Sequence, residues 1–184
     1  VAKVMGVTAK ENVPVTAKVL CCGKNDVVKF KYEYDDIFDC DSANRLGGGQ
    51  KECSYGCLGF GNCARVCAFD AIEMVDGIAF VTEKCTGCGA CVKVCPKGII
   101  DLVPKTAEYV VMCRSKDKGA AMRDKCSVGC IACRICEKAC PEGAITVEDN
   151  IAQINYEKCT NCGICSEKCP KKIIINCNIV KSGV

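Results

Sequence analysis

The stretch Cys85-Thr-Gly-Cys88-Gly-Ala-Cys91-Val-Lys-Val-Cys95-Pro96 decides how this chain folds, because its four cysteines have the spacing C-x2-C-x2-C-x3-C-P. This is the spacing that holds a cubane [4Fe–4S] cluster, with the fourth cysteine reaching across to a second cluster. The pattern recurs at 130–141 and again at 159–170. The spacing therefore predicts a protein that binds iron–sulfur clusters and moves electrons.

The composition favours iron–sulfur clusters over the other uses of cysteine. The chain has 184 residues, of which 22 are Cys and none is His. Disulfide frameworks favour small secreted domains with irregular spacings, and zinc sites use two separated C-x2-C knuckles. The lack of His excludes Rieske centres and His-ligated haem, and it also removes the usual general base. We therefore expect no catalytic site of its own in this chain.

The formal net charge of +3 counts every Cys as a neutral thiol. Four oxidised cubanes, each carrying roughly −2 with its thiolates, would bring the total to about −5, so we expect no nucleic-acid partner. No run of about 18 apolar residues is present to span a membrane, and the many free thiols indicate a reducing, cytoplasmic compartment. Since the chain begins at Val1 rather than Met, we expect further residues to precede it.

The chain is a tandem repeat. The cysteines at 53–67 align with those at 126–140 at a constant offset of 73, with Phe60 in the place of Cys133 and Ala68 in the place of Pro141. A fixed period of this kind identifies duplicated structural units. Each unit has a Cys run, a short helix after the third Cys, a hairpin and a second Cys run; Asp76-Gly77 and Asp149-Asn150 supply the hairpin turns.

This layout is that of a two-cluster bacterial ferredoxin, and it predicts an α+β fold of tandem ferredoxin-like units. The predicted domains are an N-terminal segment at 1–52 (a partial cluster-binding or docking region), a first unit at 53–104, a linker at 105–125 and a second unit at 126–178. The stretches Val13–Cys21 and Val103–Cys113 echo each other, and each looks like a strand that ends in a Cys. Because the clusters form much of the small core, the apo form should be poorly folded.

Crossed ligation assigns the cysteines to four clusters, and three sets have all the required spacings. These sets are Cys130, Cys133, Cys136 with Cys169; Cys159, Cys162, Cys165 with Cys140; and Cys85, Cys88, Cys91 with Cys67.

The fourth set holds Cys57, Cys63 and Cys95, but Phe60 replaces its middle ligand. Either Cys53 completes a cubane, or the site holds a three-iron cluster, or no cluster forms and the cysteines are structural. We favour Cys53, because an unpaired thiolate pair beside an apolar Phe has little other purpose. Against this, the matching Cys126 stands in a unit that needs no replacement ligand, which favours a shared structural role.

Six further cysteines are predicted to be small buried hydrophobes: Cys21, Cys22, Cys40, Cys113, Cys126 and Cys177. An extra cluster from Cys21, Cys22, Cys40 and Cys53 is an alternative that has no standard spacing. Gly47–Gly49 is predicted to be a turn, since no nucleotide motif surrounds it. Residues 29–36 are predicted to be an exposed loop or edge strand, with a partner-docking surface as the alternative. Five lysines near the Cys runs either offset cluster charge and steer an acidic ferredoxin or form a solvated face: Lys84, Lys93, Lys97, Lys158 and Lys168.

The stretch from Asp39 to Cys63, with its Gly-Gly-Gln-Lys and Cys-Ser-Tyr-Gly-Cys-Leu-Gly-Phe-Gly segments and the Phe-Asp-Ala-Ile that ends at Ile72, resembles the B subunit of the Rnf complex in its clostridial and acetogen form. The stretches 115–119 and 129–133 are also similar to that family. The resemblance covers about Val13 to Ile175. One departure is Ala68, where the family has Pro.

The resemblance implies an iron–sulfur subunit of a membrane-bound ferredoxin:NAD oxidoreductase, a translocase that pumps sodium ions or protons. Such a subunit accepts electrons from reduced ferredoxin at the cytoplasmic face and relays them toward the flavin-binding and NAD-binding subunits. In the family a membrane helix and a further cluster-binding segment come first, so the resemblance implies membrane association through residues absent from this chain. The alternatives are a free-standing polyferredoxin and a zinc-binding structural module.

Overall fold

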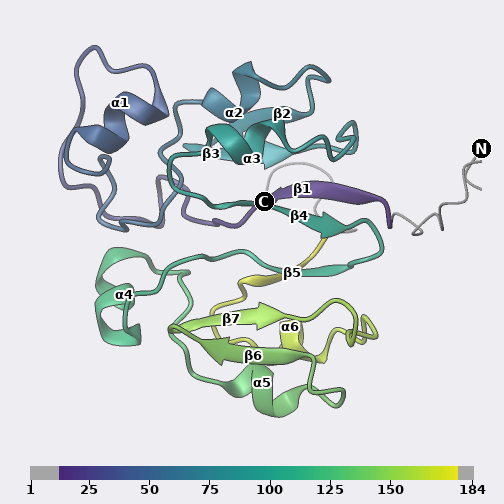
Figure 1. The fold of residues 1–184 in the computed structure, drawn as a ribbon. Helices are drawn as coiled ribbons and strands as arrows, with labels where there is room; N and C mark the ends of the chain where they lie inside the picture. The colour runs from purple at the N-terminus through teal and green to yellow at the C-terminus, as the bar shows by residue number, and fades with distance from the viewer. Residues whose placement is uncertain (1–12, 178–184) are drawn as a thin grey trace, which may run out of the picture.

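The structure is a computed structural model that describes residues 13–177. Figure 1 shows the elements in two stacked layers, with β1–β4 and α1–α3 in one layer and the later elements in the other. The first layer holds β1 (Val15–Val19), α1 (Cys40–Arg45), α2 (Asn62–Arg65), β2 (Ile72–Val75), β3 (Ile78–Val81), α3 (Ala90–Val94) and β4 (Ile100–Pro104). The second holds β5 (Tyr109–Val111), α4 (Gly119–Lys125), α5 (Ile135–Ala139), β6 (Ile145–Glu148), β7 (Ile151–Ile154), α6 (Ile164–Lys168) and β8 (Ile174–Asn176).

The two predicted hairpins are confirmed. Strand β2 pairs with β3 and β6 pairs with β7, both antiparallel, with two-residue turns between them. In the first turn Asp76 has φ 47° and Gly77 has φ 77°, and in the second Asp149 and Asn150 have φ 49° and 62°. Positive φ at both turn residues matches the right-handed twist of the flanking strands, and Asp, Asn and Gly adopt it most readily.

The outer strands of each layer pair the beginning of a repeat with its end. Strand β1 pairs with β4, and β5 pairs with β8, both antiparallel. The predicted domain boundaries cut across these pairs: the boundary at 53 separates β1 from β4, and the predicted linker at 105–125 contains β5. The pairing gives instead a first unit that begins with β1 and ends with β4, and a second unit that begins with β5 and ends with β8.

The short helices lie at the third cysteine of each run rather than after it. Helix α3 begins one residue before Cys91, and α6 begins one residue before Cys165. Both follow a glycine with positive φ, Gly89 at 77° and Gly163 at 79°. A left-handed residue there turns the chain sharply after the second cysteine, so the helix starts with its cysteine directed inward and buried.

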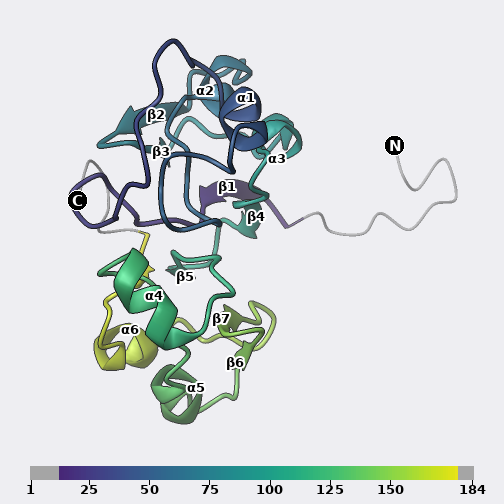
Figure 2. The same cartoon turned by 90° about the vertical axis from the view of Figure 1, so that its left-hand side faces the viewer.

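Each unit has a small apolar core that includes its cysteines. A third group of packed apolar side chains joins the two units, and its buried members are Leu20, Val103 and Val110. The segment that follows β1 also crosses to the second unit: Lys29 N–H donates to the Lys125 carbonyl, and Ser127 N–H donates to the Val27 carbonyl. Figure 2 shows α1 and α4 from the side of this crossing.

The segment at 29–36 is mostly exposed, as predicted from its charged sequence. Tyr34 O–H donates to the Ala43 carbonyl and ties the segment to α1. Gly47, Gly48 and Gly49 form the turn that ends α1, and all three have positive φ. Within 13–177, no helix is both long and apolar enough to cross a bilayer.

Candidate metal centres

The second unit contains a hollow that we call the second-unit hollow. It has a volume of about 360 Å³ and is lined by the four predicted cysteines Cys130, Cys133, Cys136 and Cys169. Burial raises the pKa of the Cys136 thiol to about 11, and the nearby charges of Cys169 and Cys130 add to the rise. Cys133 is the exposed member of the set. The structure thus brings the predicted set together around one space with one corner open to water.

The other predicted set of the second unit also converges. Burial raises the pKa of Cys165 to about 11, and Cys159, Cys162 and Cys140 lie close enough to raise it further. The Ala144 N–H donates to Cys140 Sγ at 3.3 Å. Cys162, the middle cysteine of this run, is exposed like Cys133.

The corresponding set of the first unit has the same local geometry. Ala71 N–H donates to Cys67 Sγ at 3.4 Å, which matches the Ala144–Cys140 contact. Cys85 Sγ accepts from Gly87 N–H and from Ala17 N–H of β1, each at 3.4 Å. Gly87 has φ 76°, and a Cβ there would lie 2.4 Å from the Val15 carbonyl oxygen. Glycine therefore allows this Cys run to lie directly against β1.

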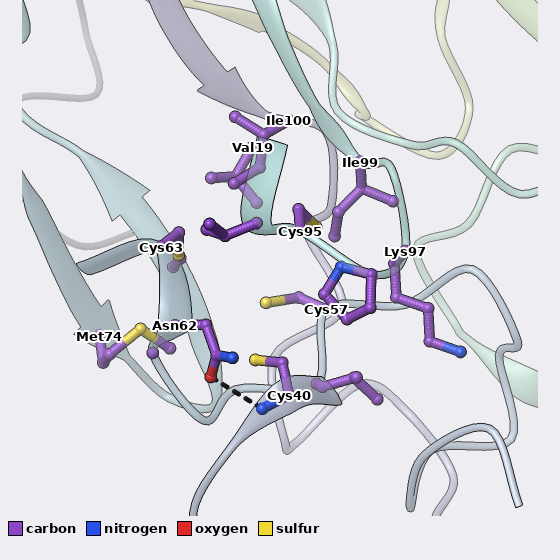
Figure 3. Close-up of a pocket in the computed structure, with 15 residues that line it drawn as sticks. Val19, Cys40, Cys57, Asn62, Cys63, Met74, Cys95, Lys97, Ile99 and Ile100 are labelled. Atoms are coloured by element: carbon purple, nitrogen blue, oxygen red, sulfur yellow. Dashed lines mark hydrogen bonds between the residues drawn. The ribbon is translucent and has the colours of Figure 1, made fainter. Parts of the chain in front are cut away.

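A second hollow, the first-unit hollow, is lined by a different set from the one predicted. It has a volume of about 370 Å³, and its cysteines are Cys40, Cys57, Cys63 and Cys95. Figure 3 shows the sulfur atoms of Cys40 and Cys57 side by side, with Cys63 and Cys95 across the same space. Burial raises the pKa of Cys63 to about 12, with Cys57 and Cys40 as the next causes. Cys53, which the sequence predicts here, does not line this hollow.

Local hydrogen bonds hold Cys40 in place. Asp39 caps α1, since its carboxylate accepts from the N–H groups of Asp41 at 3.0 Å and Ser42 at 2.9 Å. Cys40 N–H donates to Asn62 Oδ1 at 2.8 Å, the dashed line in Figure 3. Asn62 begins α2 immediately before Cys63, so one side chain fixes the distance between two of the four cysteines.

Phe60 leaves room for Cys40 instead of supplying a ligand. It packs with Tyr34 and Ile37 against the buried Leu58 and Cys40. Sequence alone predicts a small buried thiol at Cys40. Two signals were available. Cys40 directly follows residues 22–39, an inserted segment with no counterpart between Cys113 and Cys126, and only the first unit lacks the middle cysteine.

Cys53 lies in a third space, which we call the junction hollow. It has a volume of about 350 Å³ between the units, and the cysteines that line it are Cys21, Cys22, Cys53, Cys113 and Cys126. The structure therefore places Cys53, which the sequence predicts beside Cys57 and Cys63, in a different space from those two cysteines. The physical reason is that Cys53 packs with Met122 and Cys126 of the second unit.

The donor sets fit multi-atom clusters better than single ions. Within 13–177, no three His, Cys, Asp or Glu side chains converge closely enough to hold one metal ion. The first-unit and second-unit hollows each have four thiols around a space of nearly equal volume, 370 and 360 Å³. Backbone N–H groups donate to several of the cysteine sulfurs, as hydrogen bonds that stabilise and tune cluster thiolates do.

Comparison with protein-family models agrees with this geometry. A 4Fe-4S dicluster domain matches residues 129–173, and a 4Fe-4S binding domain matches residues 78–101. Both units therefore contain iron–sulfur cluster-binding domains of the ferredoxin type, in a chain of mixed helix and strand content.

Three curated proteins, each the B subunit of an oxidoreductase complex, are similar over most of the chain. That of the Na(+)-translocating ferredoxin:NAD(+) oxidoreductase complex of Acetobacterium woodii is 47% identical over 88% of this chain and 49% of its own length. That of the proton-translocating ferredoxin:NAD(+) oxidoreductase complex of Clostridium ljungdahlii is 49% identical over 88% of this chain and 58% of its own length. That of the ion-translocating oxidoreductase complex of Methanosarcina acetivorans is 41% identical over 95% of this chain and 68% of its own length. The chain thus spans about half of the first two relatives and about two thirds of the third.

Proposed function

This chain belongs to the family of B subunits of the Rnf-type ion-translocating oxidoreductase complexes, and from that premise we propose that it carries electrons from reduced ferredoxin toward the subunits that bind flavin and NAD. Family membership implies that it works with the other subunits of such a complex. In this proposal the chain lies at the cytoplasmic face of the membrane and is held there through segments outside the chain. The complex would couple the electron flow to the movement of sodium ions or protons.

The observation that carries the proposal is that both repeated units gather cysteines into sets of four. We propose four [4Fe–4S] clusters in these sets, and the ligand assignment follows the structure at Cys40. The proposed ligands are Cys40, Cys57, Cys63 and Cys95; Cys67, Cys85, Cys88 and Cys91; Cys130, Cys133, Cys136 and Cys169; and Cys140, Cys159, Cys162 and Cys165.

The chemistry that such clusters supply when bound is the uptake and release of single electrons without the making or breaking of substrate bonds. The residues of the chain bind the clusters, limit the access of water and donate hydrogen bonds to sulfur. Ala71, Ala144 and Gly87 donate such bonds through their backbone N–H groups. These contacts set how readily each site accepts an electron, and no side chain needs to act as an acid or a base.

The exposed cysteines are where an electron-donating partner can approach. Cys88 is exposed in the first unit, and Lys84 and Lys93 beside it are exposed as well. Lys97 is not available for docking, because it is half-buried and its ammonium donates to the Gly48 carbonyl at 2.7 Å. We propose that Lys84 and Lys93 attract the acidic surface of a ferredoxin toward Cys88.

Rapid mixing with reduced ferredoxin under anaerobic conditions tests the proposed function. We expect the visible absorbance of the oxidised chain to bleach, at a rate that falls as salt is added. Lys84→Glu and Lys93→Glu together should slow the bleaching at least tenfold. The matched control is Arg45→Glu, which removes an exposed cation on α1. A fully loaded chain that reduced ferredoxin does not bleach would overturn the proposal.

A further inference from the structure

The junction hollow has the features of a metal-cluster site, although no cysteine run of standard spacing supplies it. Its volume of about 350 Å³ is close to the 370 and 360 Å³ of the first-unit and second-unit hollows. Five cysteines line it: Cys21, Cys22, Cys53, Cys113 and Cys126. The first three belong to the first unit and the last two to the second, so the site exists only where the units meet.

Four of these cysteines form two equivalent pairs. Cys21 follows β1 by two residues and Cys113 follows β5 by two residues. Each accepts a backbone hydrogen bond from one of two equivalent cysteines of the repeats: Cys57 N–H donates to Cys21 Sγ at 3.4 Å, and Cys130 N–H donates to Cys113 Sγ at 3.5 Å. The equal thirteen-residue steps before Cys53 and Cys126 suggest Cys40 as the partner of Cys113, but these contacts pair Cys113 with Cys21.

The second pair is Cys53 and Cys126, which occupy the same position in the two repeats. Cys126 lies at the end of α4, and its backbone forms an isolated antiparallel β-bridge with Val28 of the first unit. Both thiols are buried, with 8% and 6% of their surface exposed. Each repeat thus contributes two cysteines to the hollow. One follows the first strand of the repeat, and the other precedes its first Cys run. A site shared equally by two repeats should have this symmetry.

The sulfur of Cys21 accepts a hydrogen bond from the backbone N–H two residues ahead, since Gly23 N–H donates to Cys21 Sγ at 3.3 Å. Gly87 and Cys85 make the same contact in a standard cluster run. The N–H groups of Tyr55, Ser115 and Val128 stand at the same position after Cys53, Cys113 and Cys126. Cys22 has no equivalent in the second repeat, where Arg114 follows Cys113, so we assign it to the lining of the hollow and not to the ligands.

A buried lysine lies beside the hollow, although it is not part of the lining. Lys51 is only 1% exposed, and its ammonium donates to the carbonyls of Gly23 and Gly77, both at 2.8 Å. It lies close to Cys21, Cys53 and Cys126 of the junction hollow and to Cys57 of the first-unit hollow. No carboxylate of the described residues lies within ion-pair distance of it. A buried ammonium needs a nearby negative charge, and four neutral thiols would not supply one.

Among residues 13–177, Ser115 is the other polar residue that is buried to the same degree, with 1% of its surface exposed. It lines the junction hollow together with Cys53, and its hydroxyl oxygen accepts from Asp117 N–H at 3.3 Å, which leaves the hydroxyl hydrogen free to donate. A hydroxyl donor to sulfur at this depth stabilises a thiolate rather than a thiol.

We propose that Cys21, Cys53, Cys113 and Cys126 bind a fifth [4Fe–4S] cluster at the junction of the two units. Lys51 and Ser115 offset its charge, and the backbone N–H groups at positions 23, 55, 115 and 128 hold the thiolates in place. The site connects the cluster sets of the two repeats, and it gives a role to four cysteines that the ferredoxin pattern leaves unused.

Counting iron and acid-labile sulfide in the anaerobically purified full chain tests the proposal without ferredoxin, so its failure is distinct from failure of the proposed function. We expect about 20 irons and about 20 sulfides per chain, four for each cubane. A fully loaded chain with about 16 irons would overturn the proposal.

Single alanine variants locate the site. We expect Cys21→Ala, Cys53→Ala, Cys113→Ala and Cys126→Ala each to lose about four irons, with about 16 retained as the sign that the fold persists. The matched control Cys22→Ala changes a cysteine in the same wall and should lose none. Iron loss in Cys22→Ala but not in Cys21→Ala would contradict the assignment of Cys21.

Lys51→Met gives a readout that does not depend on losing iron. Removing a buried positive charge beside the junction hollow should make one cluster harder to reduce, seen as a single more negative midpoint in a redox titration followed by electron paramagnetic resonance. An unchanged set of midpoints would contradict the role assigned to Lys51 and the anionic occupant that it implies.

Discussion

The first-unit and second-unit hollows are equivalent positions of one repeat, and they differ at a single corner. In the second-unit hollow the middle cysteine of the run, Cys133, fills that corner and is exposed. In the first-unit hollow Phe60 takes that place in the sequence, and Cys40 enters from α1 with 9% of its surface exposed. A repeat can therefore keep a four-thiol site while a buried cysteine that follows an inserted segment takes the place of an exposed one.

Having Cys40 in place of a middle cysteine changes the access of water to the hollow more than it changes the volume of the hollow. The volumes of the two hollows differ by only about 10 Å³. The lysine that follows the last cysteine and its proline is also matched, since Lys97 donates to the Gly48 carbonyl and Lys171 to the Ser127 carbonyl, both at 2.7 Å. The exposure of one cysteine, Cys133 against Cys40, is therefore the main difference between the two hollows.

Removing iron should have the largest effect, because we expect both units to unfold and the difference between their hollows to disappear. The thiol sets form much of each core, and metal–thiolate binding in small domains supplies free energies of about 10–16 kcal/mol, as much as the whole stability of a typical domain. We expect treatment with a chelator and a reductant to remove most of the far-ultraviolet circular dichroism. Native-like secondary structure in iron-free protein would show that the polypeptide core suffices.

The next largest effect is expected when the cysteine that differs between the two hollows is removed and then restored at position 60. Cys40→Ala should remove about four irons from the first-unit hollow, because three thiols and Phe60 remain. Adding Phe60→Cys to that variant places a cysteine where the second unit has Cys133, and it should restore those irons. The control Phe60→Leu should not restore them. If Phe60→Cys also fails, the two hollows are not equivalent in backbone geometry.

The burial of Cys40 should also lower the reduction potential of the cluster proposed in the first-unit hollow. A reduced cluster carries more negative charge, and water at Cys133 stabilises that charge better than the enclosed surroundings of Cys40 do. We expect the first-unit midpoint to lie below the second-unit midpoint by on the order of 100 mV. Redox titration of the chain and of the Cys40→Ala and Cys136→Ala variants assigns the two values. A first-unit midpoint equal to or above the other would contradict this account.

The smallest expected effect concerns the hydrogen bond that fixes Cys40. Asn62→Ala removes the acceptor for Cys40 N–H, a loss of about 1 kcal/mol, or roughly a fivefold change in an equilibrium constant. We expect a chelator to extract about four irons several-fold faster than from the unaltered chain, with the remaining irons unaffected. An unchanged rate of extraction would mean that the cap by Asp39 is sufficient to position α1.

The sequence predicts those parts of the fold that depend on local rules. The turns at Asp76-Gly77 and Asp149-Asn150 follow from residues that tolerate positive φ, and the sets built on runs such as Cys130–Cys136 follow from fixed spacings. The strand-like stretches that precede Cys21 and Cys113 are likewise present as β1 and β5. The cluster-binding character of both units and the family follow from the same residues.

What sequence could not predict depends on contacts between distant segments. The pairing of β1 with β4 joins strands about 80 residues apart, and no local pattern indicates it. The places of Cys40 and Cys53 depend on where the inserted segment crosses to the second unit, through contacts such as Val28 with Cys126. Cys40 and Cys53 are only thirteen residues apart in the sequence, yet they line different hollows.

The most direct test of the account asks whether Cys40 and Cys53 serve the same cluster or different ones. Iron and acid-labile sulfide are counted in Cys40→Ala, in Cys53→Ala and in the double variant, with Cys22→Ala as the control. We expect each single variant to lose about four irons and the double variant to lose about eight, because the two cysteines serve different clusters. A double variant that loses only about four would place both cysteines at one cluster and contradict that assignment.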